Sequence, residues 1–282
     1  MRRVKRPGTT ARWTVREVVD GAARSRPDTV VCEEPLEIRL GWPGHPADRV
    51  AITMRTPGAD FELAVGFLLS EGVIDRHQRP RRVAYCLDTA QPPEQAYNVV
   101  TVELEDAPQR PPAARSTAVS SACGVCGTQS LDAIFQSDAP ALPVAATVNG
   151  ERINSLPRAL MDVQPLFSRT GAIHAAGVFT FGGDLVVARE DIGRHNAVDK
   201  VLGARLLGTA TYGDDSILCV SGRIGFDIIS KAVIGRVSVV VAVGGPSSLA
   251  LELADRAGVT VCGFTRDHRY VVYTHPGRVD DG

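Results

Sequence analysis

The chain has 282 residues, of which 44% are hydrophobic and 22% are charged, and this globular balance excludes a wholly disordered chain. The 31 lysines and arginines nearly balance the 32 aspartates and glutamates, so the net charge of −1 gives no global argument for binding nucleic acid or a membrane surface. Six cysteines are too few for a disulfide scaffold, and no apolar run is long enough to span a bilayer.

The first 25 residues are predicted to be a basic arm. Residues 1–16 (MRRVKRPGTTARWTVR) contain six arginines and lysines and no acidic residue. Because no apolar stretch follows, this is not the pattern of a secretory signal, and we expect a solvated, disordered segment over residues 1–25. We therefore expect a cytoplasmic protein with reduced thiols, in which a close cysteine pair is more often catalytic or metal-binding than structural.

Residues 26–105 are predicted to form a smaller, mixed α+β N-terminal domain. The segment 60–72 (DFELAVGFLLSEG) has apolar residues at helical spacing and ends at a glycine, which is a helix stop. The segment that follows, RHQRPRR (76–82), is expected to be a basic loop. Runs typical of strands are Val30–Leu40, Val50–Arg55 and Tyr97–Leu104.

Residues 106–150 are predicted to be a flexible linker, because prolines and alanines interrupt them and apolar anchors are few. Within this linker lies SSACGVCGTQS, where Cys123 and Cys126 are three positions apart and a glycine follows each of them. The cysteine pair is therefore expected in a flexible loop rather than in a helix or strand.

Residues 151–282 are predicted to form a layered α/β domain. The expected elements follow the order α-β-β-α-β-α-β-α-β-β, which favours a largely parallel sheet with ligands bound at the carboxyl ends of its strands. Pro165 is expected to end or kink the first helix, and the glycines at 182–183 predict a hairpin. The expected helices cover 156–167, 195–207, 226–234 and 249–257, and the expected strands cover 173–181, 185–189, 217–220, 237–243, 259–264 and 270–274.

Four uses of the pair Cys123 and Cys126 compete. A structural zinc needs two more ligands, and the chain has no second close cysteine pair. A thiol–disulfide exchange site is usually placed at a strand-to-helix turn, whereas this pair lies in a proline-flanked loop. The remaining uses are two ordinary loop thiols, or covalent carriage of a sulfur atom as a persulfide on one thiolate. The other cysteines considered, in strand-like segments, are expected to be small buried hydrophobic groups: Cys86, Cys219 and Cys262.

Three glycine-containing turns in the second half of the chain precede predicted helices. They are EDIGRHN (190–196), SGRIG (221–225) and GGPSS (244–248). Backbone N–H groups at a helix N-terminus attract phosphates, and Arg194, His195 and Arg223 add positive charge at these turns. Together they predict a pocket for a phosphorylated ligand. The sequence has neither the P-loop nor the G-x-G-x-x-G pattern, so an ordinary P-loop NTPase and a Rossmann dehydrogenase are not indicated.

Two further features are less specific. Arg266, His268 and Arg269 form a short cationic loop between predicted strands, which is either a solvated hairpin tip or a rim that contacts a nucleotide. His174, in an apolar context, is expected to be a hydrogen-bonded core histidine.

Four segments, SACGVCGTQSLD, TGAIHAAGVF, EDIGRHNAVDKVLG and VYTHPGR, occur in this order and resemble the FdhD family of formate dehydrogenase accessory sulfurtransferases. FELAVGFLLSEGVI in the first third also agrees with that family. The matching segments run from about Phe61 to Arg278 and cover nearly the whole folded chain. EDIGRHNAVDK and the CGVCG loop are specific to the family.

The resemblance implies a sulfur carrier. Such proteins accept sulfur from a cysteine desulfurase as a persulfide and pass it to the bis(molybdopterin guanine dinucleotide) molybdenum cofactor of formate dehydrogenase. The persulfide cysteine corresponds to Cys123, and Cys126 would assist or resolve it. The family's guanine-nucleotide contact segment corresponds to Phe264, Thr265, Arg266, Asp267, His268 and Arg269. The resemblance also implies a homodimer and a C-terminal three-layer αβα domain similar to the cytidine-deaminase fold.

That implied fold raises the rival hypothesis of a zinc deaminase. Deaminases need H-x-E at one helix start and P-C-x-x-C at the next. The corresponding helix starts here, residues 195–197 and 221–225, lack the glutamate and the cysteines. We therefore expect no metal site, and we expect the same crevice, lined by Arg194, His195, Ser221 and Arg223, to cradle the molybdenum cofactor.

Two other functions stay open. One is a chaperone that binds the molybdenum cofactor without covalent sulfur transfer. The other is a thiol–disulfide oxidoreductase that cycles between dithiol and disulfide without a desulfurase. No nucleic-acid or membrane partner is expected.

Overall fold

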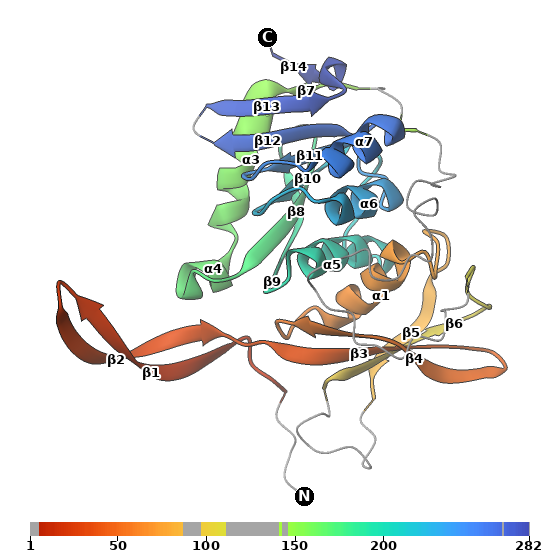
Figure 1. Ribbon diagram of the computed structural model, residues 1–282. Coiled ribbons are helices and arrows are strands. Elements are labelled where there is room, and N and C mark those ends of the chain that lie inside the picture. Colours follow the sequence, from red (N-terminus) through yellow and green to blue (C-terminus); the bar gives the residue numbers. More distant parts are fainter. Residues whose placement is uncertain (1–5, 87–96, 111–140, 143–145, 267, 282) are drawn as a thin grey trace, which may run out of the picture.

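The computed structural model describes residues 6–86, 97–110, 141–142, 146–266 and 268–281 (Figure 1). Strands β1 (Thr10–Val19) and β2 (Ala22–Val31) pair antiparallel along their whole length and project from the body of the molecule. The disordered arm expected over residues 1–25 is therefore wrong for residues 10–25, while residues 1–5 lie outside the described part.

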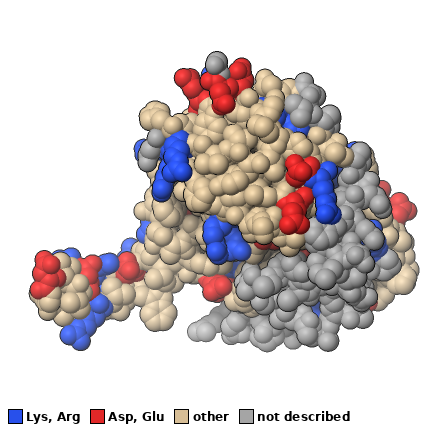
Figure 2. Space-filling view, turned by 45° about the horizontal axis from the view of Figure 1, so that its top comes forward, with Lys and Arg blue, Asp and Glu red and all other residues tan. Residues whose placement is uncertain are grey.

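The hairpin forms because its turn is well specified. Asp20 and Gly21 both have positive φ, 51° and 80°, as the two central residues of a type I′ turn require. Arg24 and Arg26 on β2 bond the Glu17 carboxylate on β1 across the strands, and charges of both signs cover the projecting hairpin (Figure 2). The basic segment thus contains an Asp-Gly turn that follows two β-branched residues, Val18 and Val19.

A four-stranded sheet of order β4-β3-β6-β5 follows the hairpin. Strand β3 pairs antiparallel with β4 and parallel with β6, and β5 pairs antiparallel with β6. The expected strand over Val30–Leu40 is divided at residues 32–33 between β2 and β3, and the expected basic loop continues into β5. The strands are β3 (Glu34–Trp42), β4 (His45–Arg55), β5 (Pro80–Tyr85) and β6 (Val99–Leu104).

A six-stranded sheet of order β13-β12-β11-β10-β8-β9 forms the centre of the larger part. Two of its pairs, β10–β11 and β11–β12, are parallel, and the other three are antiparallel. The expectation of a largely parallel sheet is wrong, because a hairpin closes each edge and leaves only the centre parallel. The strands are β8 (His174–Thr180), β9 (Leu185–Asp191), β10 (Ser216–Val220), β11 (Val239–Ala242), β12 (Thr260–Arg266) and β13 (Arg269–Thr274).

Helices cover both faces of this sheet. Helix α3 (Gly150–Asp162) packs on the face that presents Ile217 and Cys219, and α5 (Arg194–Leu206), α6 (Phe226–Ile234) and α7 (Ser248–Ala257) pack on the face that presents Leu218 and Val220. Pro165 begins a separate short helix, α4 (Pro165–Thr170), so the preceding helix ends before it, as expected. The arrangement is a mixed α/β fold, and the likeness to the deaminase fold stays a prediction.

Helix α1 (Asp60–Ser70) joins the two parts of the molecule by packing on α5. A Cβ atom on Gly66 would overlap the backbone carbonyl of Asp199, and one on Gly203 would overlap that of Glu62. Leu63 of α1 belongs to the same hydrophobic core as the apolar residues of α5. The regions expected as two domains, 26–105 and 151–282, therefore share one core.

The expected linker over residues 106–150 lies mostly outside the described residues. Near its end, Leu142 is buried, and Val148–Asn149 form the short strand β7. Strand β7 pairs with β14 (Val279–Asp280), which follows a 3-10 turn over Pro276–Arg278. Buried Arg278 donates to the backbone carbonyls of Leu142 and Gly258, at 3.2 and 2.8 Å. No helix in the described ranges is both long and apolar enough to cross a membrane.

Candidate functional site

The turns after β10 and β11, residues 221–225 and 244–248, lie side by side, and strand β12 bonds the second of them. Gly244 N donates to Gly222 O at 3.1 Å, and Ile224 N donates to Gly245 O at the same distance. Phe264 N donates to Gly244 O, also at 3.1 Å. The predicted turns 221–225 and 244–248 are therefore together at the carboxyl ends of parallel strands, even though the sheet is mixed.

Glycine is needed where the turns meet. A Cβ atom on Gly244 would lie 2.8 Å from Gly222 O, and a Cβ atom on Gly245 would lie 2.5 Å from Cζ of Phe264. Phe264 has φ of 52°, a left-handed value that is costly for an aromatic residue, and its side chain is 40% exposed. The backbone thus holds an aromatic ring over the second turn and open to solvent.

The start of helix α5 brings Arg194 and His195 to this edge. The Asp191 carboxylate accepts hydrogen bonds from Gly193 N at 2.9 Å and from the Asn196 amide at 3.0 Å, and it pairs with Lys200 at 2.7 Å. Lys200 and Asp191 are almost fully buried. Asp191 and Lys200 of the EDIGRHNAVDK motif therefore hold the helix start rather than face a ligand.

His195 joins two helix N-termini. Its Nε2 atom lies 2.5 Å from Oδ2 of Asp227, in the first turn of α6. Burial acts to raise the pKa of Asp227, but the His195 imidazole and the Arg194 guanidinium outweigh burial and lower this pKa below its ordinary value. Asp227 was not singled out from the sequence, although its place two residues after the glycine of the SGRIG turn was the available signal.

His174 is half-buried beside the same turn and is not a core histidine. A Cβ atom on Gly222 would lie 3.6 Å from His174 Nδ1 and 3.7 Å from Arg194 Cδ, so both side chains flank that glycine. Burial, followed by the charges of Arg194 and His195, lowers the pKa of His174. A neutral imidazole at neutral pH follows, able to accept a hydrogen bond through one ring nitrogen.

A cavity of about 460 Å³ opens beside His174 and Ser221. The Ser221 hydroxyl, which lines this cavity, accepts a hydrogen bond from Ala175 N at 2.9 Å, and this bond fixes its position. Apolar groups on the cavity wall are Leu160, Met161, Phe167, Val220 and Val243. An apolar cavity with a few fixed polar groups is typical of sites for small organic ligands.

The remaining predicted site residues have different surroundings. Arg223 is exposed on the turn over residues 221–225. Thr265 is fully buried, and among the described residues its hydroxyl has no hydrogen-bond partner. Arg266 and Arg269 lie opposite each other in the register of β12 and β13. Both side chains are exposed at the tip of this hairpin, as is His268. Asp267, Cys123 and Cys126 lie outside the described residues.

The described cysteines partly match expectation. Cys219 and Cys262 are fully buried, and burial raises the pKa of both thiols, that of Cys262 to about 12. Cys86 is only partly buried, unlike the expected buried group. Within the part of the chain that the structure describes, no three His, Cys, Asp or Glu side chains are grouped to hold a metal ion.

Comparisons with known proteins match this chain to one family. The model of the FdhD/NarQ family matches residues 31–280. The chain is 44% identical over 276 residues to a protein from Streptomyces coelicolor named sulfur carrier protein FdhD, covering 96% of this chain and 95% of the relative. It is 41% identical over 274 residues to the protein of the same name from Mycolicibacterium paratuberculosis, covering 96% and 98% of the two chains.

A solved structure shares the fold. The crystal structure of a candidate formate dehydrogenase accessory protein from Desulfotalea psychrophila superposes with a TM-score of 0.74 at 24% sequence identity. The match covers 97% of this chain and 100% of that one. The long hairpin, the four-stranded sheet and the six-stranded sheet thus belong to one fold rather than to separate modules.

Proposed function

Because this chain belongs to the FdhD/NarQ family, we propose that it is a sulfurtransferase that carries sulfur as a persulfide on Cys123. Its donor is a cysteine desulfurase, and its acceptor is the bis(molybdopterin guanine dinucleotide) cofactor, bound as a substrate before formate dehydrogenase receives it. The names of its curated relatives support the sulfur-carrier role. We propose further that it acts in the cytoplasm as a homodimer.

The loading step is a thiol exchange. The Cys123 thiolate attacks the outer sulfur of the desulfurase persulfide, so a new S–S bond forms and the donor S–S bond breaks. The donor cysteine leaves as a thiolate, and no net oxidation occurs. The product is Cys123 with one additional sulfur atom.

The delivery step needs two electrons, because the outer sulfur must leave as sulfide to become a metal ligand. Attack of the Cys126 thiolate on the inner sulfur supplies them: a Cys123–Cys126 disulfide forms as the sulfide leaves. A dithiol reductant then restores the pair. Cys126 is thus the resolving thiol in this scheme.

The observation that carries the acceptor assignment is the meeting of three turns at one edge of the sheet. Backbone N–H groups at the starts of α5 and α6 attract phosphate oxygens, and Arg194 and Arg223 add fixed positive charge. The Nε atom of Arg194 is buried, and among the described residues it has no hydrogen-bond partner. An anion at this edge would satisfy it, and the exposed Phe264 ring offers a face on which a guanine can stack.

Intact-protein mass spectrometry tests the carrier role. The full chain is incubated with a cysteine desulfurase and free cysteine, and wild type is compared with Cys123→Ala and with Cys86→Ala as the matched control. We expect a gain of one reducible sulfur atom in wild type and in the control, and none in Cys123→Ala. Lack of sulfur gain in wild type while the desulfurase turns over would overturn the proposal.

Maturation of formate dehydrogenase separates the alternatives. Sulfur transfer predicts near-total loss of client activity in Cys123→Ala while the variant still binds guanine nucleotide. A cofactor-holding chaperone predicts that some maturation survives in that variant. A thiol–disulfide oxidoreductase predicts dithiol–disulfide cycling that needs no desulfurase.

A further inference from the structure

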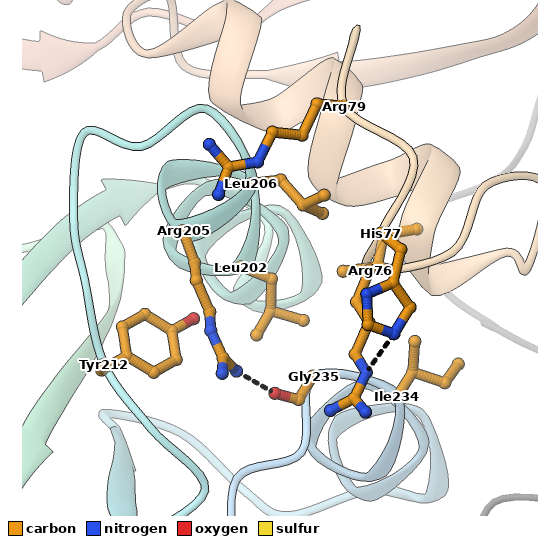
Figure 3. A pocket seen from close by; sticks show the side chains of 10 residues that line it. Arg76, His77, Arg79, Leu202, Arg205, Leu206, Tyr212, Ile234 and Gly235 are labelled. Atoms are coloured by element: carbon orange, nitrogen blue, oxygen red, sulfur yellow. Dashed lines mark hydrogen bonds between the residues drawn. The ribbon is translucent and has the colours of Figure 1, made fainter. Parts of the chain in front are cut away.

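A second cavity, of about 330 Å³, lies at the opposite ends of helices α5 and α6 from the candidate site (Figure 3). Its walls come from the last turns of α1, α5 and α6 and from the loop between α1 and β5. Four basic side chains line it, Arg76, His77, Arg79 and Arg205, and its described lining contains no acidic residue. Figure 3 shows them arranged around Leu202 and Leu206.

Arg205 makes contacts that stabilise the fold. Its guanidinium donates to Gly235 O at 2.9 Å, after the end of α6, and lies 4.7 Å from the centre of the Tyr212 ring. A cation at the carbonyl end of a helix is favourable, so this arginine needs no ligand to explain its place. The nearby carboxylate of Asp214 lies 3.9 Å from it and bonds Arg236 at 2.9 Å.

Arg76 and Arg79 differ from Arg205, because no helix-end contact of either is found among the described residues. Arg76 Nε donates to His77 Nε2 at 3.3 Å, which a neutral imidazole can accept. In the described ranges, neither arginine has a carboxylate partner. Like charges that line one cavity repel each other, and a bound anion would remove that repulsion.

The lining and the volume of the cavity restrict the chemical class and the size of the anion that fits. Leu69, Leu202, Leu206 and Ile234 supply the apolar part of the cavity wall. The volume is at the lower end of the range for small-molecule sites. Arginine is the preferred residue for phosphate, because its planar guanidinium bonds two oxygens at once.

We propose that this cavity binds a small phosphorylated compound, of mononucleotide size or less, at a site separate from the sulfur-transfer site. The arginines from the α1–β5 loop hold the phosphate, and the apolar side receives the organic part. The proposal does not depend on the sulfur-carrier role, because it uses none of the residues assigned to it. Residues of α1, α5 and α6 line the cavity, so a ligand bound there would also stabilise the packing of α1 against α5 and α6.

Isothermal titration calorimetry of the full chain with AMP and with inorganic pyrophosphate tests the proposal. Wild type is compared with the double variant Arg76→Gln/Arg79→Gln. The matched control is Arg81→Gln/Arg82→Gln, which removes two exposed arginines of β5 that do not line the cavity. We expect the double variant to lose roughly tenfold or more in affinity and the control to stay within about twofold.

A third variant, Arg194→Gln/Arg223→Gln, shows whether the probes bind at the other site. If it loses binding while Arg76→Gln/Arg79→Gln binds as wild type does, the proposal is overturned. Lack of binding of either probe to wild type at millimolar concentration also overturns it. An acidic peptide is titrated in the same way. If it binds and neither phosphate compound does, the arginines belong to a surface for a protein partner and the proposal is overturned.

Discussion

The two ends of helix α5 differ in how their charges are held. At its start, Asp191 and Lys200 are buried and paired, and His195 contacts Asp227 on the neighbouring helix. At its end, Arg76 and Arg79 approach a cavity without carboxylate partners among the described residues. The first end is a preorganised site whose geometry the backbone dictates, and the second is a set of exposed charges that a ligand can reposition.

The largest expected effect comes from breaking the close contact between α5 and α1. In Gly203→Ala the new Cβ would overlap the backbone carbonyl of Glu62, and neither helix can yield cheaply. We expect a loss of about 3 kcal/mol or more in the free energy of unfolding, measured by urea denaturation. Gly213→Ala is the control, because its Cβ would meet no atom within 4 Å. Similar stabilities would contradict the close helix contact.

Breaking the buried pair at the start of α5 is expected to be nearly as severe. Lys200→Met leaves Asp191 buried without its counter-charge, at a cost of about 3 kcal/mol. Asp191→Asn added to that variant should recover part of the loss, because the uncompensated charge is gone. Arg158→Met, which breaks an exposed pair with Asp162, should change the free energy of unfolding by about 0.5 kcal/mol or less.

The contact between His195 and Asp227 gives a smaller effect that depends on pH. The pKa of Asp227 is lowered in the folded chain, so this carboxylate stabilises the fold above its ordinary pKa of 3.8 and loses that contribution as the pH falls through the lowered value. Asp227→Asn should cost about 1–2 kcal/mol at neutral pH. The difference from wild type should shrink below pH 3.8, and a difference that grew in acid would reverse the sign of this argument.

The smallest effect is expected at the other end of the helix. Arg76→Gln/Arg79→Gln removes two charges that have no carboxylate partner in the described part of the chain. Thermal unfolding at low salt should show a stability change of about 0.5 kcal/mol or less, in the stabilising direction, which added salt abolishes. A clear loss of stability would mean that these arginines serve the fold rather than a ligand.

Local patterns predicted the long, strongly periodic elements well. The helix expected over 226–234 is α6 with the same bounds, and the helix in 60–72 is α1. The glycine turns after β10 and β11 also lie where expected. These predictions depend only on apolar spacing and on glycine stops, which neighbouring residues in the chain supply.

The hairpin over residues 10–31 was missed because charge was weighted above turn chemistry. The Asp20–Gly21 turn and the β-branched residues beside it were a local signal for two strands. Similarly, the sheet was expected to be largely parallel because the element order alternates, although hairpins at both edges impose antiparallel pairing.

Residue spacing and residue chemistry thus indicated the family, most of the helices and the positions of the glycine turns. Packing alone placed His174 beside Arg194, paired His195 with Asp227, and gathered basic side chains around a cavity between α1, α5 and α6. The physical reason is distance along the chain. Local propensity acts over a few residues, whereas Arg194 follows His174 by 20 positions, Asp227 follows His195 by 32, and Arg205 follows Arg76 by 129. These groups meet only when the helices dock on the sheet and on each other.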